Sequence, residues 1–161
     1  MEEFPFWSFS VEFYGRPGVA PACLALQDRF GCDVNLVLFA LWAARCETHL
    51  EAAEFERLDA AVKPWRTRVV EPIRGLRRSL KSETLAVSPE SAETCRKKLL
   101  DAELAAECAA QGSLARTLSL KDPEDDSNRD LAQANLSAYL AWRGVDSDLA
   151  RQLAGTILAA L

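Results

Sequence analysis

The sequence is poor in histidine and has no glycine-rich loop, and both shortages limit the chemistry that it can support. His49 is the single histidine, and no serine or cysteine lies at a recognisable spacing from it to form a nucleophile and base pair. The seven glycines are dispersed and mostly follow predicted helices, so none forms a loop that could hold phosphate groups. We therefore expect no catalytic centre and no cofactor.

Zinc ligands are also scarce. Cys46 and His49 would lie one turn apart on a helix, but the sequence has no Cys-x-x-Cys pair to complete a tetrahedral site. The five cysteines are an odd number without the close spacing of a secreted disulfide framework. We expect free buried thiols, no bound metal and a reducing, cytoplasmic environment.

No apolar run is long enough to cross a bilayer. The longest, residues 36–44, continues from Val34 across the polar Asn35, whereas a membrane helix needs about 18 apolar residues. The residues that follow Met1 are acidic, and a secretory signal would begin with basic ones. These features predict a buried core helix over 34–47 and no membrane association.

Strand signals are missing, because no segment sustains an alternation of apolar and polar residues and no Asn-Gly or Asp-Gly turn joins β-branched runs. The sequence therefore predicts an all-α fold. We expect a single domain over 1–161, in which seven or eight helices form a compact irregular bundle around the central apolar helix. The predicted helices are 5–14, 19–30, 34–47, 48–62, 64–81, 89–112, 129–143 and 147–161.

Several helix limits have a clear cause in the sequence. Gly15 and Gly31 follow the first two helices, where glycine can adopt the left-handed conformation that ends a helix. Asp33 lies where an N-cap carboxylate accepts the free amides of the central helix. Thr48, with Glu51 three residues later, matches a capping box that would begin the fourth helix.

Proline and acidic residues shape the second half of the chain. Pro72 lies inside the predicted helix 64–81 and should kink or split it, because proline lacks the amide hydrogen that the helix needs. Ser88 followed by Pro89 is typical of a helix start. The acidic segment 121–130 contains Pro123 and is interpreted as a mobile loop.

Charge is distributed unevenly along the chain. The net charge is −5, yet residues 63–81 contain seven basic residues and one acidic residue, a local charge of +6. At about 100° per residue, this helix has an apolar stripe on one face and cations on the other. The stripe comprises Trp65, Val69, Ile73, Leu76 and Leu80, and the cations are Arg74, Arg77, Arg78 and Lys81.

Three kinds of neighbour could neutralise this cationic face. The preceding helix could do so internally, an acidic protein could bind there, or the phosphates of RNA or DNA could bind. The overall negative charge opposes the nucleic-acid alternative. The acidic residues available near and on the preceding helix are Glu47, Glu51, Glu54, Glu56 and Asp59.

Polar residues gather around the turn before the central helix. If Gln27, Asp28 and Asn35 are buried, they must form hydrogen bonds either with one another and the backbone, or with a ligand. We take these three, together with Arg45 of the central helix, as the candidate ligand-binding residues.

The aromatic first helix is a candidate interface, because its apolar surface is broader than one stripe. It is either buried on two sides or partly in contact with a partner, where aromatic residues are enriched. The two faces carry Phe6, Phe9 and Phe13, and Trp7, Val11 and Tyr14. The candidate partner-binding residues are Phe6, Trp7, Arg74, Arg77, Arg78 and Lys81, and the partner would be another protein or a second copy of the chain.

Several short motifs are shared with a known family. They are Phe6-Trp7-Ser8-Phe9-Ser10, Tyr14, Gly18-Val19, residues 22–28, Gly31, Asp33-Val34-Asn35-Leu36, Trp42 and residues 71–81. Together they resemble a proteobacterial domain-of-unknown-function family of helical proteins of about this length. The resemblance implies a helical fold and a bacterial, cytoplasmic protein, and it brings no activity, cofactor or substrate.

These observations favour a non-enzymatic adaptor or regulatory module that binds a partner through the aromatic first helix, the basic helix face, or both. One alternative is a small-molecule or enzymatic site around the 27–35 turn. Another is RNA binding through the basic helix.

Overall fold

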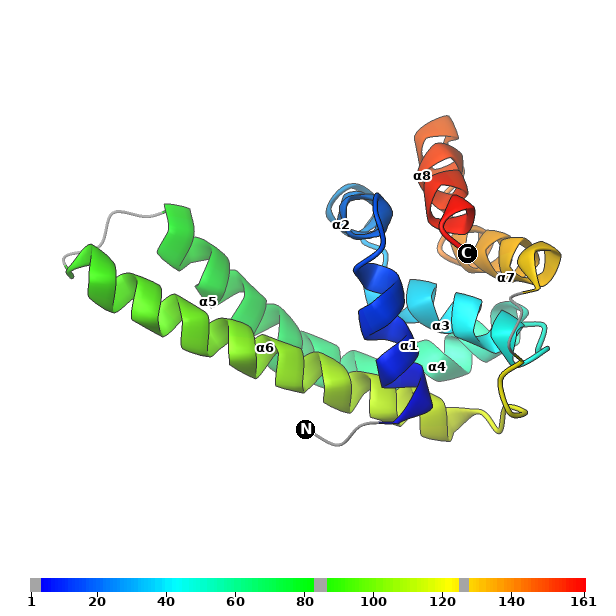
Figure 1. Cartoon of the computed structure of the whole chain (residues 1–161), viewed down its shortest axis with the longest axis horizontal. Helices are drawn as coiled ribbons and strands as arrows, with labels where there is room; N and C mark the ends of the chain where they lie inside the picture. Colours follow the sequence, from blue (N-terminus) through cyan, green and yellow to red (C-terminus); the bar gives the residue numbers. More distant parts are fainter. Residues whose placement is uncertain (1–3, 83–86, 125–127) are drawn as a thin grey trace.

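A computed structural model describes residues 4–82, 87–124 and 128–161 of the chain. Within these ranges the fold is all-α, with eight α-helices, one π-helical turn and no strand, which confirms the predicted fold class. Figure 1 shows their arrangement. The elements are α1 (Pro5–Tyr14), α2 (Val19–Phe30), α3 (Val34–Arg45), α4 (Ala52–Trp65), η1 (Arg66–Val70), α5 (Glu71–Ser82), α6 (Pro89–Thr117), α7 (Arg129–Trp142) and α8 (Asp148–Ala159).

The apolar helix α3 is the centre of the molecule, as predicted. All residues from 35 to 44 are buried, and α3 packs along α7 while α1, α2, α4 and α6 contact its other sides. Phe6 of α1 and Phe39 of α3 meet edge to face with their ring centroids 5.2 Å apart. Each large side chain buried in this way contributes about 1.5–3 kcal/mol to folding.

The turns around α2 confirm the predicted helix limits and correct the predicted conformation of one cap. Asp33 Oδ1 accepts a hydrogen bond from the Asn35 amide at 2.8 Å, and Gly31 has the left-handed φ of 64°. Gly15 is right-handed, with φ −75°, so the left-handed cap predicted there is wrong. The chain takes the left-handed conformation three residues later, at Gly18, where φ is 83°.

The start of α4 also differs from the prediction. The capping box is formed by Glu51 and Glu54, so α4 begins at Ala52 and not at Thr48. Asn135 of α7 explains the shift, because it accepts a hydrogen bond from the Leu50 amide and donates one to the Thr48 carbonyl. These two bonds hold residues 48–50 outside the helix.

Helices α4 and α5 are joined without a break through the π turn η1. Pro64 lies in the last turn of α4 and does not start a new helix, which corrects the predicted boundary. The predicted disturbance at Pro72 takes the form of the π turn, in which the Glu71 amide donates to the Arg66 carbonyl five residues back. Such a wide turn suits the segment before a proline, whose ring crowds the preceding turn of an α-helix.

An arm formed by α5 and α6 projects from the body of the molecule (Figure 1, left). Helix α5 packs against α6, and the far ends of both helices extend away from α1–α3, α7 and α8. Helix α6 continues to Thr117, beyond its predicted end at Gly112, because Gly112 is buried inside the helix and the next turn buries Leu114.

No helix in the described ranges has both the length and the apolar character that a membrane span requires. Part of the predicted acidic loop 121–130, residues 125–127, lies outside the described residues. In the described part, the Glu124 amide donates to the Arg45 carbonyl at 2.9 Å. Arg129 begins α7, and Ser147 caps α8, close to the predicted limits.

Candidate functional site

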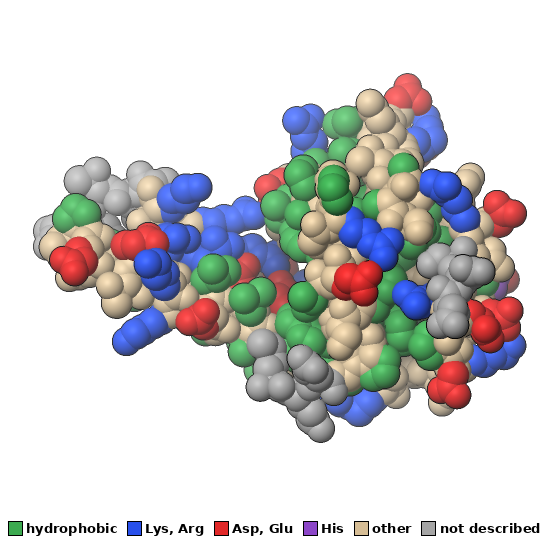
Figure 2. All heavy atoms as spheres, viewed as in Figure 1, with side chains coloured by type: hydrophobic (Ala, Val, Ile, Leu, Met, Phe, Trp, Pro, Cys, Tyr) green, Lys and Arg blue, Asp and Glu red, His purple; other side chains and the backbone are tan. Residues whose placement is uncertain are grey.

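A groove of about 440 Å³ lies where α1, α2 and α3 meet the base of the α5–α6 arm, and we name it the α1–α6 groove. Four apolar side chains line its mouth and stay 37–56% exposed: Val11, Leu24, Leu100 and Leu104. Figure 2 shows hydrophobic side chains gathering on this face over α1 and the adjoining part of α6. Exposed apolar side chains grouped around one hollow are typical of a binding surface.

Helix α1 supplies one wall of the groove because it has two apolar faces. Phe6, Phe9 and Phe13 face the core and are at most 8% exposed. Trp7 and Val11, on the other face, line the groove. Of the two aromatic residues predicted to bind a partner, Trp7 therefore lies at the groove, whereas Phe6 is a core residue.

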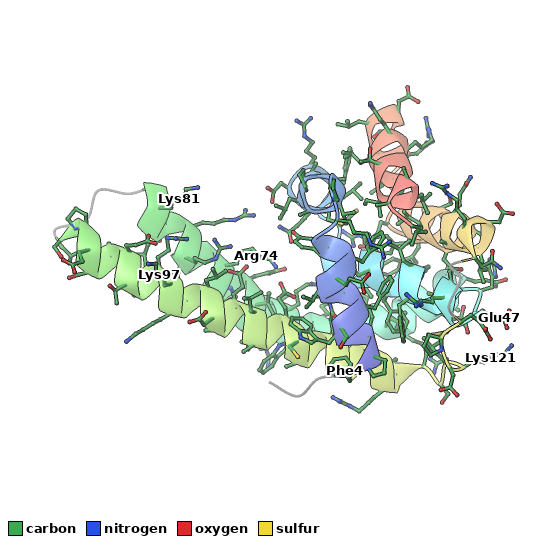
Figure 3. All side chains as sticks on the ribbon, in the orientation of Figure 1. Phe4, Glu47, Arg74, Lys81, Lys97 and Lys121 are labelled. Atoms are coloured by element: carbon green, nitrogen blue, oxygen red, sulfur yellow. The ribbon has the colours of Figure 1, made fainter. Side chains whose placement is uncertain are left out.

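A charged wall closes one side of the groove, where side chains of α2, α5 and α6 meet. Arg74 of α5 donates to Gln27 Oε1 at 2.7 Å and to Glu103 Oε1 at 3.0 Å, and it also bonds to Glu107. This one guanidinium ties three helices together, and Figure 3 shows it between the arm and the body. Arg78 reaches from α5 to Asp28 of α2, at 3.2 Å.

The packing of the basic helix is partly the reverse of the prediction. Arg77 bonds to Glu103 of α6, whereas Leu76, predicted to pack, is 53% exposed. The π turn explains this, because its extra residue rotates α5 by about 100° relative to a continuous α-helix.

The carboxylates that pair with the arginines of α5 come from α6 and α2. Of the acidic residues considered on the preceding helix, Asp59 pairs with Arg66, at 2.8 Å.

The two glutamates of the charged wall have pKa values shifted in opposite directions. Burial disfavours the ionised form of Glu103, but hydrogen bonds from Arg77 and Arg74 outweigh it and lower the pKa. Burial dominates at Glu107 and raises its pKa, although the hydrogen bond from Asn35 and the charge of Arg74 oppose it. Of these two glutamates, Glu103 is therefore the more firmly ionised, and Glu107 protonates more easily.

The residues predicted around the 27–35 turn are only partly brought together. Gln27 and Asn35 both line the groove. Asp28 is half-exposed beside them and bonds to Gln27 and Arg78. Arg45 lies at the opposite end of α3, where it donates to the Glu124 carbonyl at 3.0 Å, so it does not contribute to this site.

A second, more polar cavity of about 300 Å³ lies on the other side of the charged wall. Gln27, Asn35, Arg74 and Glu107 line both cavities. Its remaining lining includes Asp33 and Arg66, which form an ion pair at 2.7 Å, and Tyr139, whose hydroxyl accepts a bond from the Asp33 amide.

Some residues of the groove were not found from the sequence. Glu103, Glu107 and Gln111 recur every four residues on an alanine-rich helix, and this polar stripe was the signal that could have revealed them. Ser10, buried among the aromatic residues of α1, carries no such signal. Lys81, predicted to bind a partner, is exposed on the arm beyond the groove (Figure 3).

The cysteines do not contribute a reactive centre to the groove. Cys23, Cys32, Cys46 and Cys108 are buried, and burial raises the pKa of Cys46 to about 11. In the part of the chain that the structure describes, no three His, Cys, Asp or Glu side chains are grouped so that they could hold a metal ion.

The fold and the groove together define an all-α protein with an open apolar groove beside a buried charged wall. The family model described as a protein of unknown function, DUF2390, matches residues 5–114, and the chain belongs to this family. Every residue that lines the groove, from Trp7 to Gln111, lies within the match. The comparison with curated proteins finds no match, and the comparison with solved structures finds none either.

Proposed function

We propose that the chain is a non-enzymatic interaction module that binds an apolar segment of a partner protein in the α1–α6 groove. The observation that carries the proposal is the set of exposed apolar side chains at the mouth, Val11, Leu24, Leu100 and Leu104. Leaving them in water costs free energy that a bound apolar segment would recover.

The distribution of these side chains favours a peptide segment over a small molecule. They lie on three helices and remain exposed at the rim, so a molecule that only filled the hollow would leave much of them in water. A helix that places apolar residues three or four positions apart would cover both the hollow and the rim.

Charge on the arm favours acidic residues beside that apolar segment. Lys81 and Lys97 are exposed on α5 and α6 beyond the groove (Figure 3). Arg74 and Arg77 are held by Glu103 and do not form the open row of cations that a nucleic-acid backbone would need. Carboxylates on the partner would therefore meet the arm lysines and speed association.

A peptide library displayed on phage and selected against the whole chain tests the proposal. We expect enrichment of peptides that combine spaced apolar residues with acidic ones. Leu104→Glu should weaken their binding at least about tenfold, because it places a charge at the apolar rim. Ala105→Glu is the matched control, since it adds the same charge at the next exposed position of α6, which does not line the groove.

Fluorescence anisotropy with the purified variants would give the two affinities, and thermal unfolding would show that both variants fold. Selection of no peptide, or equal loss of binding in Leu104→Glu and Ala105→Glu, would contradict binding in the groove.

A further inference from the structure

Two residues that line the α1–α6 groove each carry a buried polar atom that lacks a hydrogen-bond partner in the described part of the chain. The two atoms are Ser10 Oγ of α1 and Gln111 Oε1 of α6, and each residue is only 2% exposed. Buried polar atoms are almost always hydrogen-bonded, so two orphaned atoms on one cavity point to a group that arrives with the bound molecule.

The orientation of Gln111 follows from a chain of hydrogen bonds that begins at Arg74. A guanidinium only donates, so Glu107 accepts from it with one carboxylate oxygen and accepts from Asn35 Nδ2 with the other. Asn35 Oδ1 is then directed to Gln111 Nε2, which donates to it at 2.9 Å. Gln111 Oε1 is left as an acceptor, and its direction is set by the charge of Arg74 through Glu107 and Asn35.

The Ser10 hydroxyl complements this acceptor, because it can donate a hydrogen bond as well as accept one. Together the two residues offer one acceptor and one donor. A carboxamide has the matching groups, since its NH₂ donates to Gln111 Oε1 and its carbonyl accepts from Ser10. A carboxylate has no hydrogen to donate, and a hydrocarbon would leave both atoms unpaired.

We infer that the segment bound in the groove carries an asparagine or glutamine whose carboxamide pairs with Ser10 and Gln111, between the apolar residues that fill the mouth. This inference rests on the proposed function, because it specifies one residue of the partner segment. It also explains how an apolar groove discriminates between segments, since an apolar pocket alone separates similar side chains poorly.

The test compares pairs of synthetic peptides taken from the phage selection, in which the asparagine or glutamine is retained or replaced by leucine or methionine of similar size. Wild-type protein should prefer the carboxamide peptide by about tenfold, because the replacement leaves two buried atoms unpaired. Ser10→Ala should reduce this preference to about threefold or less. Ser8→Ala, at an exposed position of the same helix, is the control and should leave the preference unchanged.

The free protein provides a second measurement. If Ser10 Oγ has no partner within the chain, Ser10→Ala should keep or raise the Tm relative to Ser8→Ala, whereas a lower Tm would show that the hydroxyl is already bonded and would overturn the inference. Groove-binding peptides that lack asparagine and glutamine, or a preference that Ser10→Ala does not alter, would overturn it as well and leave the proposed function standing. Absence of any peptide sensitive to Leu104→Glu would instead contradict the proposed function itself.

Discussion

A single buried amide, Asn135, fixes the path of the chain between α3 and α4. It is fully buried, accepts from the Leu50 amide at 2.8 Å, and donates to the carbonyls of Ala40 and Thr48. An asparagine in the middle of a helix gives no hint of this role in the sequence. The residues to which it hydrogen-bonds are 85–95 positions away along the chain.

Replacing that amide should be among the most damaging changes in the protein. Asn135→Leu removes the hydrogen-bond partner of the Leu50 amide and of the Thr48 carbonyl, so we expect it to lower the free energy of unfolding by about 2–4 kcal/mol. Urea unfolding would measure the loss. Gln133→Leu, at an exposed position of the same helix, should change the free energy by less than about 0.5 kcal/mol, and equal losses in both variants would contradict the role given to Asn135.

The opposite pKa shifts of Glu103 and Glu107 predict opposite effects of pH on stability. The pKa of Glu103 is lowered on folding from an ordinary 4.5, so its contribution is present above pH 4.5 and is lost as the pH falls through the lower folded value. The pKa of Glu107 is raised, so its contribution is present below pH 4.5 and is lost as the pH rises through the higher folded value.

Unfolding in urea across a pH series would separate the two carboxylates. Glu103→Gln should flatten the loss of stability on the acid side of pH 4.5, and Glu107→Gln should flatten the decline just above it. The assignment would be contradicted if both variants changed the same limb of the profile.

At the scale of whole elements, local sequence signals located most helices. They failed where contacts with distant parts of the chain determine a helix limit or the face that a helix buries. The central helix could be predicted because α3 is apolar on every side, and Asp33 and Gly31 mark its start. The face of α5 that contacts α6 could not be predicted, because the π turn shifts the helical register and Arg77 binds a glutamate 26 residues further along the chain.

The groove could also be predicted only in part, where the pattern within a single segment was sufficient. The second apolar face of α1 pointed to Trp7, and the polar turn pointed to Gln27 and Asn35, all of which line the groove. The orphaned atoms of Ser10 and Gln111 depend on which helices become neighbours, and a spacing along the chain does not specify that.

The arm should be the least protected helical part of the molecule. Among the described residues, helix α5 packs against α6 alone beyond the π turn, and it reaches the body through long side chains such as those of Arg74 and Arg78. Few buried contacts mean that local opening costs little free energy. In hydrogen exchange, amides of residues 73–82 should exchange at least about tenfold faster than those of α3, and equal protection would show that another molecule covers the arm in solution.

At the scale of the whole molecule, the cysteines provide a test of how tightly the body is closed. Four of the five are buried, and Cys95 is exposed on the arm. Burial and the neighbouring Cys32 raise the pKa of Cys23 to about 12, which keeps it in the unreactive thiol form.

Native protein should therefore release one equivalent of thionitrobenzoate quickly from Ellman's reagent, and five equivalents after denaturation. Cys95→Ser should abolish the fast phase and leave the total at four. A second fast thiol in the native protein would indicate that the helical body opens more readily than its packing implies.

The unbroken course of α4, η1 and α5 makes the arm a lever. The twelve residues of α5 extend about 18 Å from the π turn, so a rotation of about 10° at that pivot would move the tip by about 3 Å. The groove lies between the arm and the body, so a segment bound there would contact both parts, and any change in the angle between them would be largest at the tip of the arm.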